Sequence, residues 1–291
     1  MSAALAHICR RDPQRLALAL GLSDREARLE VQLLLAHVLQ KPRSFLIAHG
    51  ESPLEPPIAG LYEALLDRRL QGEPMAYILG HREFYGMELC LSPAVLIPRP
   101  DTETLVEAAL RRLPPATRRT VLDLGTGSGA IALALALQRP HAQVTASDIS
   151  PDALGIAQAN AQRLGAPNID WHLGDWFEGL DGQFDLIVSN PPYIPARDPH
   201  LDLGDLRFEP PQALVGGPDG LEAIRRIIRQ AHHHLATGGS LMVEHGFDQA
   251  QRVQDLLTAH GFEEVCAFPD LAGIARVSAG RWRPAAAPTA P

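Results

Sequence analysis

The stretch from Val121 to Ala130 (VLDLGTGSGA) joins a short apolar run to a glycine-rich turn and to the start of an alternating Ala/Leu segment. The apolar run predicts a buried strand, and the Ala/Leu segment, which continues to Gln138, predicts a helix. The three glycines allow a tight turn and let the backbone approach a ligand closely. Strand, glycine turn and helix in this order predict the first unit of a doubly wound sheet, and the spacing also fits the dinucleotide pattern Gly-x-Gly-x-x-Ala.

Strand and helix patterns alternate through the rest of the chain. The predicted strands are Val121–Leu124, Gln143–Ser147, Ile169–Leu173, Phe184–Ser189 and Ser240–Glu244, with two further strand-like runs at Glu264–Phe268 and Ile274–Ser278. The predicted helices are Ala130–Gln138, Pro151–Leu164, Leu221–Leu235 and Gln249–His260. This alternation predicts an α/β fold with a Rossmann-like, doubly wound, mostly parallel sheet and helices on both faces.

The N-terminal part predicts a small all-helical domain. Apolar residues recur at helical spacing from Asp24 to Leu39, with Ser23 as the expected N-cap, and again from Pro57 to Leu70. Residues 41–56 between them are expected to form a Pro/Gly-rich connection. No catalytic constellation occurs in this part, which favours a packing or recognition module.

A break at Gly72-Glu73-Pro74 separates this helical part from the sheet. Residues 77–96 alternate in a way that predicts a β-hairpin with Gly86 near its turn. A helix capped by Asp101 or Thr102 is expected to follow and to run to Arg112. The expected domains are therefore a helical domain at 1–74, a hairpin linker at 75–98, a catalytic domain at 99–283 and a disordered Ala/Pro-rich tail at 284–291.

Composition limits the possible function classes. The chain has 291 residues, of which 46% are hydrophobic, and a formal net charge of −8 without an obvious basic stripe, which argues against a dedicated DNA binder. The three cysteines, at 9, 90 and 266, match no metal or redox spacing and fit a reducing compartment. No signal-peptide pattern occurs, and no apolar run approaches the roughly 20 residues that cross a bilayer. We expect a cytoplasmic protein without a membrane span.

Three polar or aromatic residues follow the second and third strands of the sheet. Asp148 ends the second strand, where a carboxylate can accept hydrogen bonds from both hydroxyls of a ribose; capping the helix at Pro151 is the alternative. Asp175 can accept from an adenine amino group. Trp176 can lie against the ring, with core packing as its alternative. This set predicts a nucleoside site without deciding between NAD and S-adenosylmethionine.

The turn Asn190-Pro191-Pro192-Tyr193 follows the fourth strand and decides between these cofactors. Neither proline can continue the strand, so the chain turns where open α/β sheets bind ligands. The Asn oxygen and a Pro carbonyl can accept the two hydrogens of a planar –NH2 group, and Tyr193 can cover its face. A dehydrogenase needs a proton relay that cannot be placed in this sequence. An amide-binding turn beside the cofactor predicts instead the transfer of an electrophilic group to nitrogen.

Together these residues resemble the S-adenosylmethionine-dependent methyltransferases, and more narrowly the family of peptide chain release factor glutamine methyltransferases. The glycine turn and the Asn190 turn are shared by many amino-methyltransferases. Three segments are more specific: LIPRPDTE at 96–103, DPHLDLGDLRFEP at 198–210, and GEPMAYILG at 72–80 with the helical part before it. The resemblance implies methylation of the side-chain amide nitrogen (N5) of the glutamine in the Gly-Gly-Gln motif of class I release factors.

The resemblance also implies roles for individual residues. Gly125, Thr126, Gly127, Ser128 and Gly129 would line the methionine and ribose side of S-adenosylmethionine, Asp148 would hold the ribose, and Trp176 would flank the adenine. Asn190 and Pro191 would grip the substrate amide beside the cofactor, with Pro192 and Tyr193 shaping the slot. Phe84, Arg99, Pro100 and Glu103 are weaker candidates for closing the cofactor pocket. Independently of the resemblance, Asp198, His200 and Glu209 are polar candidates near the site, and we expect them to organise the loop rather than to carry a proton.

Two other functions and one metal site are weighed against this interpretation. A methyltransferase acting on N6 of adenine or N4 of cytosine would use the same turn on a flipped base, but the acidic balance argues against it. A non-catalytic binding module would have no need of the amide grip. The run His232-His233-His234 points to different faces of a helix, so no metal site is expected there. We expect release factors as partners, no stable nucleic-acid binding and a monomer.

Overall fold

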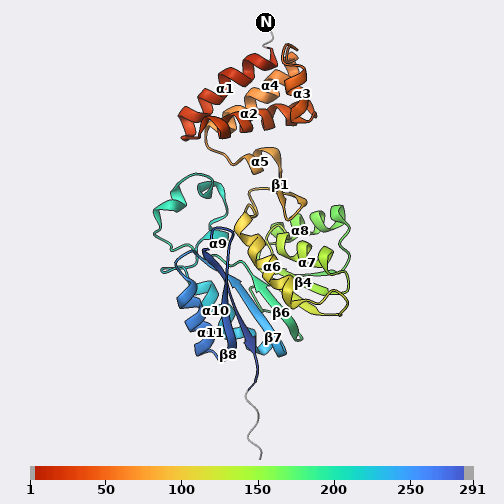
Figure 1. Cartoon of the computed structure of the whole chain (residues 1–291), viewed down its shortest axis with the longest axis vertical. Helices are drawn as coiled ribbons and strands as arrows, with labels where there is room; N and C mark the ends of the chain where they lie inside the picture. The colour runs from red at the N-terminus through yellow and green to blue at the C-terminus, as the bar shows by residue number, and fades with distance from the viewer. Residues whose placement is uncertain (1–3, 285–291) are drawn as a thin grey trace, which may run out of the picture. The chain divides into compact units, whose positions relative to one another are not determined.

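A computed structural model describes residues 4–284 of the chain (Figure 1). They divide into two compact units: a helical unit, up to His81 together with Asp202–Phe208, and a sheet unit, which contains Arg82–Leu201 and the residues from Glu209 onward. The sequence division at residues 74 and 98 differs from this one. No local pattern marks 202–208 as part of the helical unit, because its membership depends on contacts made far along the chain. The expected tail falls outside the described residues except for Pro284.

The described part of the helical unit, residues 4–81 and 202–208, contains five helices and a short 3₁₀ turn. They are α1 (Leu5–Leu20), α2 (Asp24–Leu39), α3 (Arg43–Ala48), α4 (Pro56–Leu70), α5 (Met75–Leu79) and η3 (Leu206–Phe208). Ser23 caps α2 as predicted, in a capping box in which its hydroxyl accepts from the Glu26 amide and the Glu26 carboxylate accepts from the Ser23 amide. The predicted connection at 41–56 contains α3, whose Leu46 joins the buried core of this unit.

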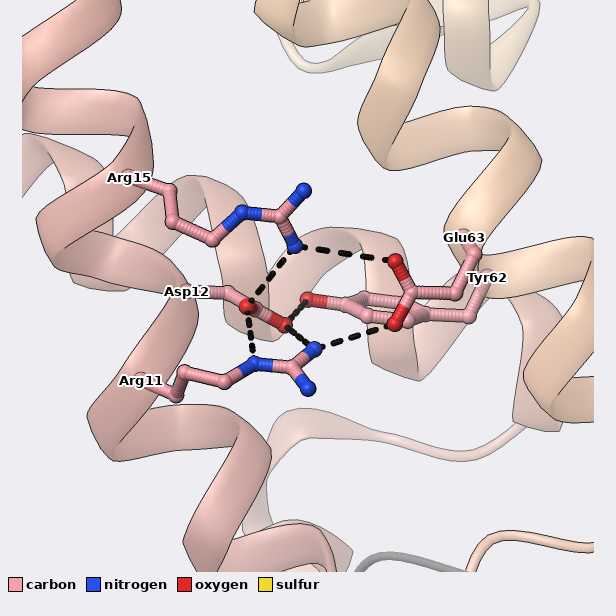
Figure 2. Close-up of polar contacts among 5 residues, drawn as sticks. All are labelled: Arg11, Asp12, Arg15, Tyr62 and Glu63. Atoms are coloured by element: carbon pink, nitrogen blue, oxygen red, sulfur yellow. Dashed lines mark hydrogen bonds and ion pairs between the residues drawn. The ribbon is translucent and has the colours of Figure 1, made fainter.

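A buried carboxylate ties α1 to α4 inside this unit (Figure 2). The Asp12 side chain has no exposure and accepts hydrogen bonds from Arg11, Arg15 and the Tyr62 hydroxyl, the last at 2.9 Å. Glu63 on α4 pairs with Arg11 at 3.0 Å and completes the cluster. Both oxygens of Asp12 therefore have partners, as a buried charge requires.

Up to residue 284, the sheet unit contains a two-stranded hairpin and a seven-stranded sheet. The hairpin is β1 (His81–Phe84), whose first residue belongs to the helical unit, and β2 (Met87–Cys90); the sheet strands are β3 (Thr120–Leu124), β4 (Gln143–Asp148), β5 (Ile169–Leu173), β6 (Phe184–Ser189), β7 (Leu235–Glu244), β8 (Phe262–Pro269) and β9 (Ala275–Trp282). The helices are α6 (Glu103–Arg112), α7 (Ala130–Gln138), α8 (Pro151–Leu164), α9 (Pro211–Leu214), α10 (Glu222–His234) and α11 (Ala250–Ala259), with 3₁₀ turns η1 (Pro100–Thr102) and η2 (Pro199–Asp202). The predicted α/β fold class is confirmed.

Strand order in the large sheet is β5-β4-β3-β6-β7-β9-β8. The strands from β5 to β7 run parallel, and β9 is antiparallel to both β7 and β8. The helices α6, α7 and α8 lie on one side of the strands, and α10 and α11 lie on the other (Figure 1). Residues of β3, β6 and β7 are buried on both faces, which explains why these strands read as continuous apolar runs.

The strand order places two turns side by side. The chain leaves β3 toward β4 and β5, and it returns to pair β6 on the other flank of β3, which makes a topological switch point. Leu124 and Ser189 are register partners at the ends of β3 and β6. The glycine turn after Leu124 and the Asn190 turn after Ser189 therefore emerge at the same edge of the sheet, where open α/β sheets bind their ligands.

Two expectations about local structure were wrong. Residues 75–79 form the helix α5, so the hairpin is confined to His81–Cys90 with its turn at Tyr85-Gly86. Neither expected residue caps α6: Thr102 precedes it without a side-chain cap, and Asp101 lies within η1 and pairs with Arg276 at 2.9 Å. The Thr102 hydroxyl instead accepts a hydrogen bond from Asn190. Across residues 4–284, none of the helices has the length and apolar character needed to cross a membrane.

Candidate functional site

A cavity of about 250 Å³ lies at the carboxyl ends of β3, β4 and β6. Its walls come from the glycine turn, the residues after β4 and β5, the Asn190 turn and two segments further away in sequence. The lining residues are Ala94, Val95, Leu96, Gly125, Gly127, Asp148, Ile149, Ser150, Ala153, Gly174, Asp175, Trp176, Asn190, Pro192, Pro210, Gln212 and Ala213. No Lys, Arg or His of the described residues is among them, whereas two carboxylates are.

The glycine turn brings backbone to the cavity wall. Gly125 and Gly127 both have positive φ, at 70° and 55°, and both line the cavity. A methyl group at Gly127 would enter open space, whereas one at Gly125 would meet the Trp176 ring at 3.5 Å. The turn therefore leaves room for a ligand to approach its backbone.

The other three residues of the predicted turn lie beneath it. Thr126 is buried and its hydroxyl donates to Asp123 at 2.7 Å. Ser128 is also buried, and its carbonyl accepts from Asn160 at 3.0 Å. A methyl group at Gly129 would meet Ala157 and Leu133 at 3.1 Å, so this glycine allows α7 to pack closely. These residues hold the shape of the turn rather than line the cavity.

Asp148 joins the glycine turn to the end of β4. Its carboxylate accepts from the Gly127 amide at 2.8 Å and from the Ser150 amide at 2.9 Å. The cap of α8 is Ser150, whose hydroxyl accepts from Ala153, so the alternative role of Asp148 as a helix cap is not used. Each carboxylate oxygen keeps a lone pair for a ligand hydroxyl. Burial raises the pKa of Asp148 above its ordinary value, against the effect of these backbone hydrogen bonds.

Asp175 and Trp176 form the wall after β5. Asp175 pairs with Arg226 of α10 at 2.8 Å, which fixes one carboxylate oxygen and leaves the other for a donor. Trp176 has a φ of 57°, unusual for a residue with a side chain, and its ring packs partly against the apolar core and partly against the cavity. A flat aromatic surface beside a free carboxylate oxygen suits a purine ring.

The Asn190 turn presents its amide to the cavity. The Asn190 Nδ2 donates to the Thr102 hydroxyl at 3.1 Å, so Oδ1 is the end left for a ligand. Two glycines pack against the turn, since a methyl group at Gly216 would lie 2.4 Å from the Pro192 carbonyl and one at Gly220 would lie 2.3 Å from the Tyr193 carbonyl. Among the described residues, none donates a hydrogen bond to the Pro191 carbonyl.

Tyr193 points away from the cavity toward a buried acid. Its hydroxyl approaches Glu244, the last residue of β7, at 3.4 Å, and its carbonyl accepts from Gln249 at 3.0 Å. Glu244 is 1% exposed, and burial raises its pKa to about 7. Asp123 beneath the glycine turn is likewise buried, with its pKa raised by burial to about 7.

The other residues that the sequence placed at or near the site hold neighbouring segments in place. Glu209 is buried, accepts from the Ile97 amide at 2.9 Å and pairs with Arg99. Asp198 accepts from both the amide and the ring of His200, within one exposed turn. The weaker pocket candidates Phe84, Arg99, Pro100 and Glu103 are described residues, but they do not line this cavity.

Several lining residues were not predicted from the sequence. Ala94, Val95 and Ala213 carry no polar or glycine signal that marks a site, and Gln212 is polar but lies at no predicted strand end; only the fold brings them to the cavity. Ile149 could have been predicted, because it follows Asp148 directly; in the structure its large apolar side chain is 60% exposed. Of residues 4–284, no three or more His, Cys, Asp or Glu side chains gather in a way that could hold a metal ion.

The donor set fits one kind of cofactor better than another. Two carboxylates without a lining cation oppose the pyrophosphate of a dinucleotide and favour a ligand with positive charge. The carboxylate of Asp148, the Trp176 ring and the open backbone at Gly127 fit a nucleoside. A nucleoside bearing a cationic group matches S-adenosylmethionine, whose sulfonium carries that charge.

Comparison with known proteins gives two family matches. Residues 14–80 match the PrmC N-terminal domain, and residues 101–206 match the methyltransferase small domain. The chain is 53% identical to the release factor glutamine methyltransferase of Bordetella pertussis over 87% of this chain and 94% of that protein. It is 44% identical to the protein of that name from Aliivibrio fischeri over 97% of this chain and 99% of that protein.

Solved structures share the fold. A methyltransferase from Pyrococcus furiosus superposes with a TM-score of 0.54 at 20% identity, covering 75% of this chain and 98% of that chain. The 16S rRNA N2 G1207 methyltransferase of T. thermophilus, in complex with AdoMet and guanosine, gives a TM-score of 0.53 at 23% identity, covering 70% of this chain and 50% of that chain. At these identities the likeness shows the fold alone.

Proposed function

We propose a function for this chain, which belongs to the release factor glutamine methyltransferase family. Its Asn190 turn holds a glutamine side chain of a release factor while a methyl group is transferred to the amide nitrogen. The enzyme is an S-adenosylmethionine-dependent methyltransferase. Its substrate atom is N5 of the glutamine in the Gly-Gly-Gln motif of class I release factors. The observation that carries the proposal is the cation-free cavity bordered by Asn190.

The cofactor occupies the cavity beside the glycine turn. Bound there, S-adenosylmethionine would supply an electrophilic methyl group, and breaking of the carbon–sulfur bond would leave a neutral thioether. The carboxylate of Asp148 accepts from the ribose hydroxyls, Trp176 lies against the adenine, and the free oxygen of Asp175 accepts from its amino group. The backbone at Gly125 and Gly127 lines the ribose and methionine side, while Thr126, Ser128 and Gly129 keep the turn in shape.

Asn190 and Pro191 grip the substrate amide. The Asn190 Oδ1 accepts one hydrogen of the glutamine –NH2 group, and the Pro191 carbonyl, which has no donor of its own within residues 4–284, accepts the other. Accepting both hydrogens returns electron density to the nitrogen and aims its lone pair. Such orientation is worth roughly 7–11 kcal/mol of barrier. No strong base is required, since the nitrogen can lose its proton after it has been alkylated.

Pro192 and Tyr193 shape the slot in different ways. Pro192 lines the cavity directly. Tyr193 contributes through its backbone, which Gln249 holds, and through its hydroxyl behind the turn.

The helical unit docks the release factor. The chain leaves the turn at Tyr193 and joins the helical unit from Asp202 to Phe208. There Arg207 donates to the Gln71 carbonyl at 3.0 Å, and Asp205 lies 3.7 Å from Arg69. A release factor that docks on the helical unit therefore binds to a unit that residues 194–201 join to the reactive turn. The acidic chain acts as a cytoplasmic monomer and forms no stable complex with nucleic acid.

A methyl-transfer assay with four acceptors tests this function. The full chain is incubated with labelled S-adenosylmethionine and either intact release factor, the same factor with the motif glutamine changed to glutamate, a Gly-Gly-Gln peptide, or duplex DNA. Label should appear only on the glutamine-containing acceptors, with a lower KM for the intact factor than for the peptide. Label in DNA, or none in release factor by a protein that binds cofactor, would contradict the function. Equal KM values for factor and peptide would remove the docking role alone.

A further inference from the structure

The buried side of the Asn190 turn contains hydroxyls and a carboxylate that the proposed chemistry does not use. Asn190 donates to Thr102, 88 residues earlier in the chain. Thr102 is 3% exposed and Glu244 is 1% exposed, and neither lines the cavity. Oε2 of Glu244 has no hydrogen-bond partner among residues 4–284. A buried carboxylate with an unsatisfied oxygen calls for a functional explanation.

The donor and acceptor roles of Asn190, Thr102 and Glu244 depend on one another. The Thr102 hydroxyl accepts from Asn190, so its own hydrogen remains to be donated. Glu244 is the neighbouring acceptor: its Oε2 has no partner among residues 4–284, and the Thr102 hydroxyl lowers the pKa of its carboxyl, against the larger effect of burial. An ionised carboxylate can only accept. A hydroxyl that donates to such a carboxylate stays an acceptor toward Asn190.

We propose that Glu244, acting through Thr102, is a positioning residue that sets which end of the Asn190 side chain faces the substrate. With Glu244 ionised, the Asn190 –NH2 must face Thr102 and the Oδ1 must face the cavity. Without an acceptor at 244, the Thr102 hydroxyl can turn and donate to Oδ1. The amide then rotates and presents its –NH2 to the cavity, where it opposes the –NH2 of the substrate.

This inference rests on the proposed grip by Asn190, and it adds a cause for the orientation of that side chain. The groups that face Glu244 come from three other segments. Asp101 raises the pKa of Glu244, and the Tyr193 hydroxyl and Arg276 lower it. Protonation of Glu244 should have the same effect as its replacement, because a carboxylic acid can donate to Thr102. The rate should therefore fall as pH drops through about 7.

Single-turnover rates of four variants at saturating cofactor test the relay. Thr102→Val removes the hydroxyl with little change in shape, and Glu244→Gln replaces the obligate acceptor by an amide that can also donate. Each should lower the rate about tenfold, since the competent orientation is no longer enforced. Thr102→Ser keeps the hydroxyl and should retain at least about a third of the rate. Glu263→Gln makes the same change at an exposed acid of β8 and should leave the rate as it is.

The double variant and the pH profile separate positioning from mere structural support. Thr102→Val with Glu244→Gln should be no slower than Thr102→Val alone, because the two groups act in series. Cofactor affinity and KM for release factor should stay within about twofold. The acid limb near pH 7 should disappear in Glu244→Gln; an acid limb that persists there belongs to another group such as Asp123, whose pKa is also raised.

Two outcomes would overturn the relay. One is wild-type turnover by Thr102→Val, and the other is full additivity of the two single losses. An inactive Asn190→Ala combined with an unaffected Thr102→Val would leave the grip intact and remove only the relay. If Glu244→Gln does not fold, the contrast between Thr102→Val and Thr102→Ser still decides.

Discussion

Asp12 in the helical unit and Glu244 in the sheet unit are both buried carboxylates, but their surroundings differ. Asp12 accepts from two arginines and from the Tyr62 hydroxyl, so both of its oxygens have donors (Figure 2). Glu244 has a long contact with Tyr193 at 3.4 Å, and its second oxygen has no partner within residues 4–284. The difference appears in their acidity: the pKa of Asp12 is lowered and that of Glu244 is raised to about 7.

The causes of these opposite shifts are the same in kind. Burial raises the pKa of both carboxyls. At Asp12 the hydrogen bonds from Arg11, Tyr62 and Arg15 outweigh burial, whereas at Glu244 the favourable effects of the Thr102 and Tyr193 hydroxyls do not. A fully paired buried charge fixes a structure, and an incompletely paired one weakens it. An unfavourable buried charge of this kind is retained where it serves a function. Glu244 lies next to the reactive turn, where it contacts the Tyr193 hydroxyl.

Removing the paired carboxylate should have the largest effect on stability. Asp12→Ala leaves the buried Tyr62 hydroxyl without its acceptor and removes the buried hydrogen bond between α1 and α4. We expect a loss of about 3 kcal/mol in the free energy of unfolding of the helical unit, near the low end for a broken buried pair because the arginines can reach water. Denaturant unfolding measures it. Glu63→Ala, at a half-exposed site of the same cluster, should lose less than about 1 kcal/mol.

Removing the side-chain amide of the reactive turn should lower the rate of methyl transfer and leave stability almost unchanged. Asn190→Ala should slow methyl transfer about a hundredfold, because the substrate loses an acceptor and its nitrogen rotates away from the methyl group. The free energy of unfolding and the cofactor affinity should hardly change. Single-turnover kinetics with release factor provide the measurement. A wild-type rate would mean that Asn190 only terminates β6 and that the proposed mechanism is wrong.

Asp148 tests whether a carboxylate at the cavity wall behaves like Glu244 or like Asp12. Its oxygens each accept one backbone amide and retain capacity for a ligand. Asp148→Ala should weaken S-adenosylmethionine binding about tenfold or more, since charge-assisted hydrogen bonds contribute roughly 1.5–3 kcal/mol. Calorimetric titration of the folded variant measures the affinity. Unchanged binding would assign Asp148 to the support of the glycine turn alone.

The smallest effect concerns the pH dependence of stability, where the two carboxylates should have opposite signs. The folded-state pKa of Glu244 lies above its ordinary value, so the sheet unit should lose stability as pH rises from about 4.5 to 7. The folded-state pKa of Asp12 lies below its ordinary value of 3.8, so its contribution is complete above that pH and is lost on acidification below it. Glu244→Gln should therefore raise the free energy of unfolding by about 1 kcal/mol at pH 8 and by less at pH 5.

Thermal unfolding of Glu244→Gln at the two pH values measures this difference. A variant that is more stable yet slower than the wild-type protein would place Glu244 among residues kept for activity. Equal destabilisation at pH 5 and pH 8 would instead mean that the carboxylate is a paired structural charge like Asp12.

The sequence was most informative where the physical signal is local. The bounds of α7, α8, β5 and β6 agree with prediction, because apolar period and flanking glycine or proline residues define them within a short window. The prediction failed at α5 and α3, which are short helices whose formation depends on packing into the helical core. It also failed at Thr102: a Ser or Thr before a helix reads as a cap, yet its hydroxyl serves a residue that only the fold brings near.

Residue types and strand ends alone account for the chemistry available at the sheet edge: a glycine turn after β3, Asp148 at the end of β4 and an amide turn after β6. These follow from strand ends, which local patterns mark well, and from side-chain types that suit one reaction. Tertiary structure decided which of these groups face the cavity, that segment 202–208 belongs to the helical unit, and that Thr102 and Glu244 lie behind Asn190. Those arrangements depend on contacts between residues far apart in the chain, for which no short pattern of residues exists.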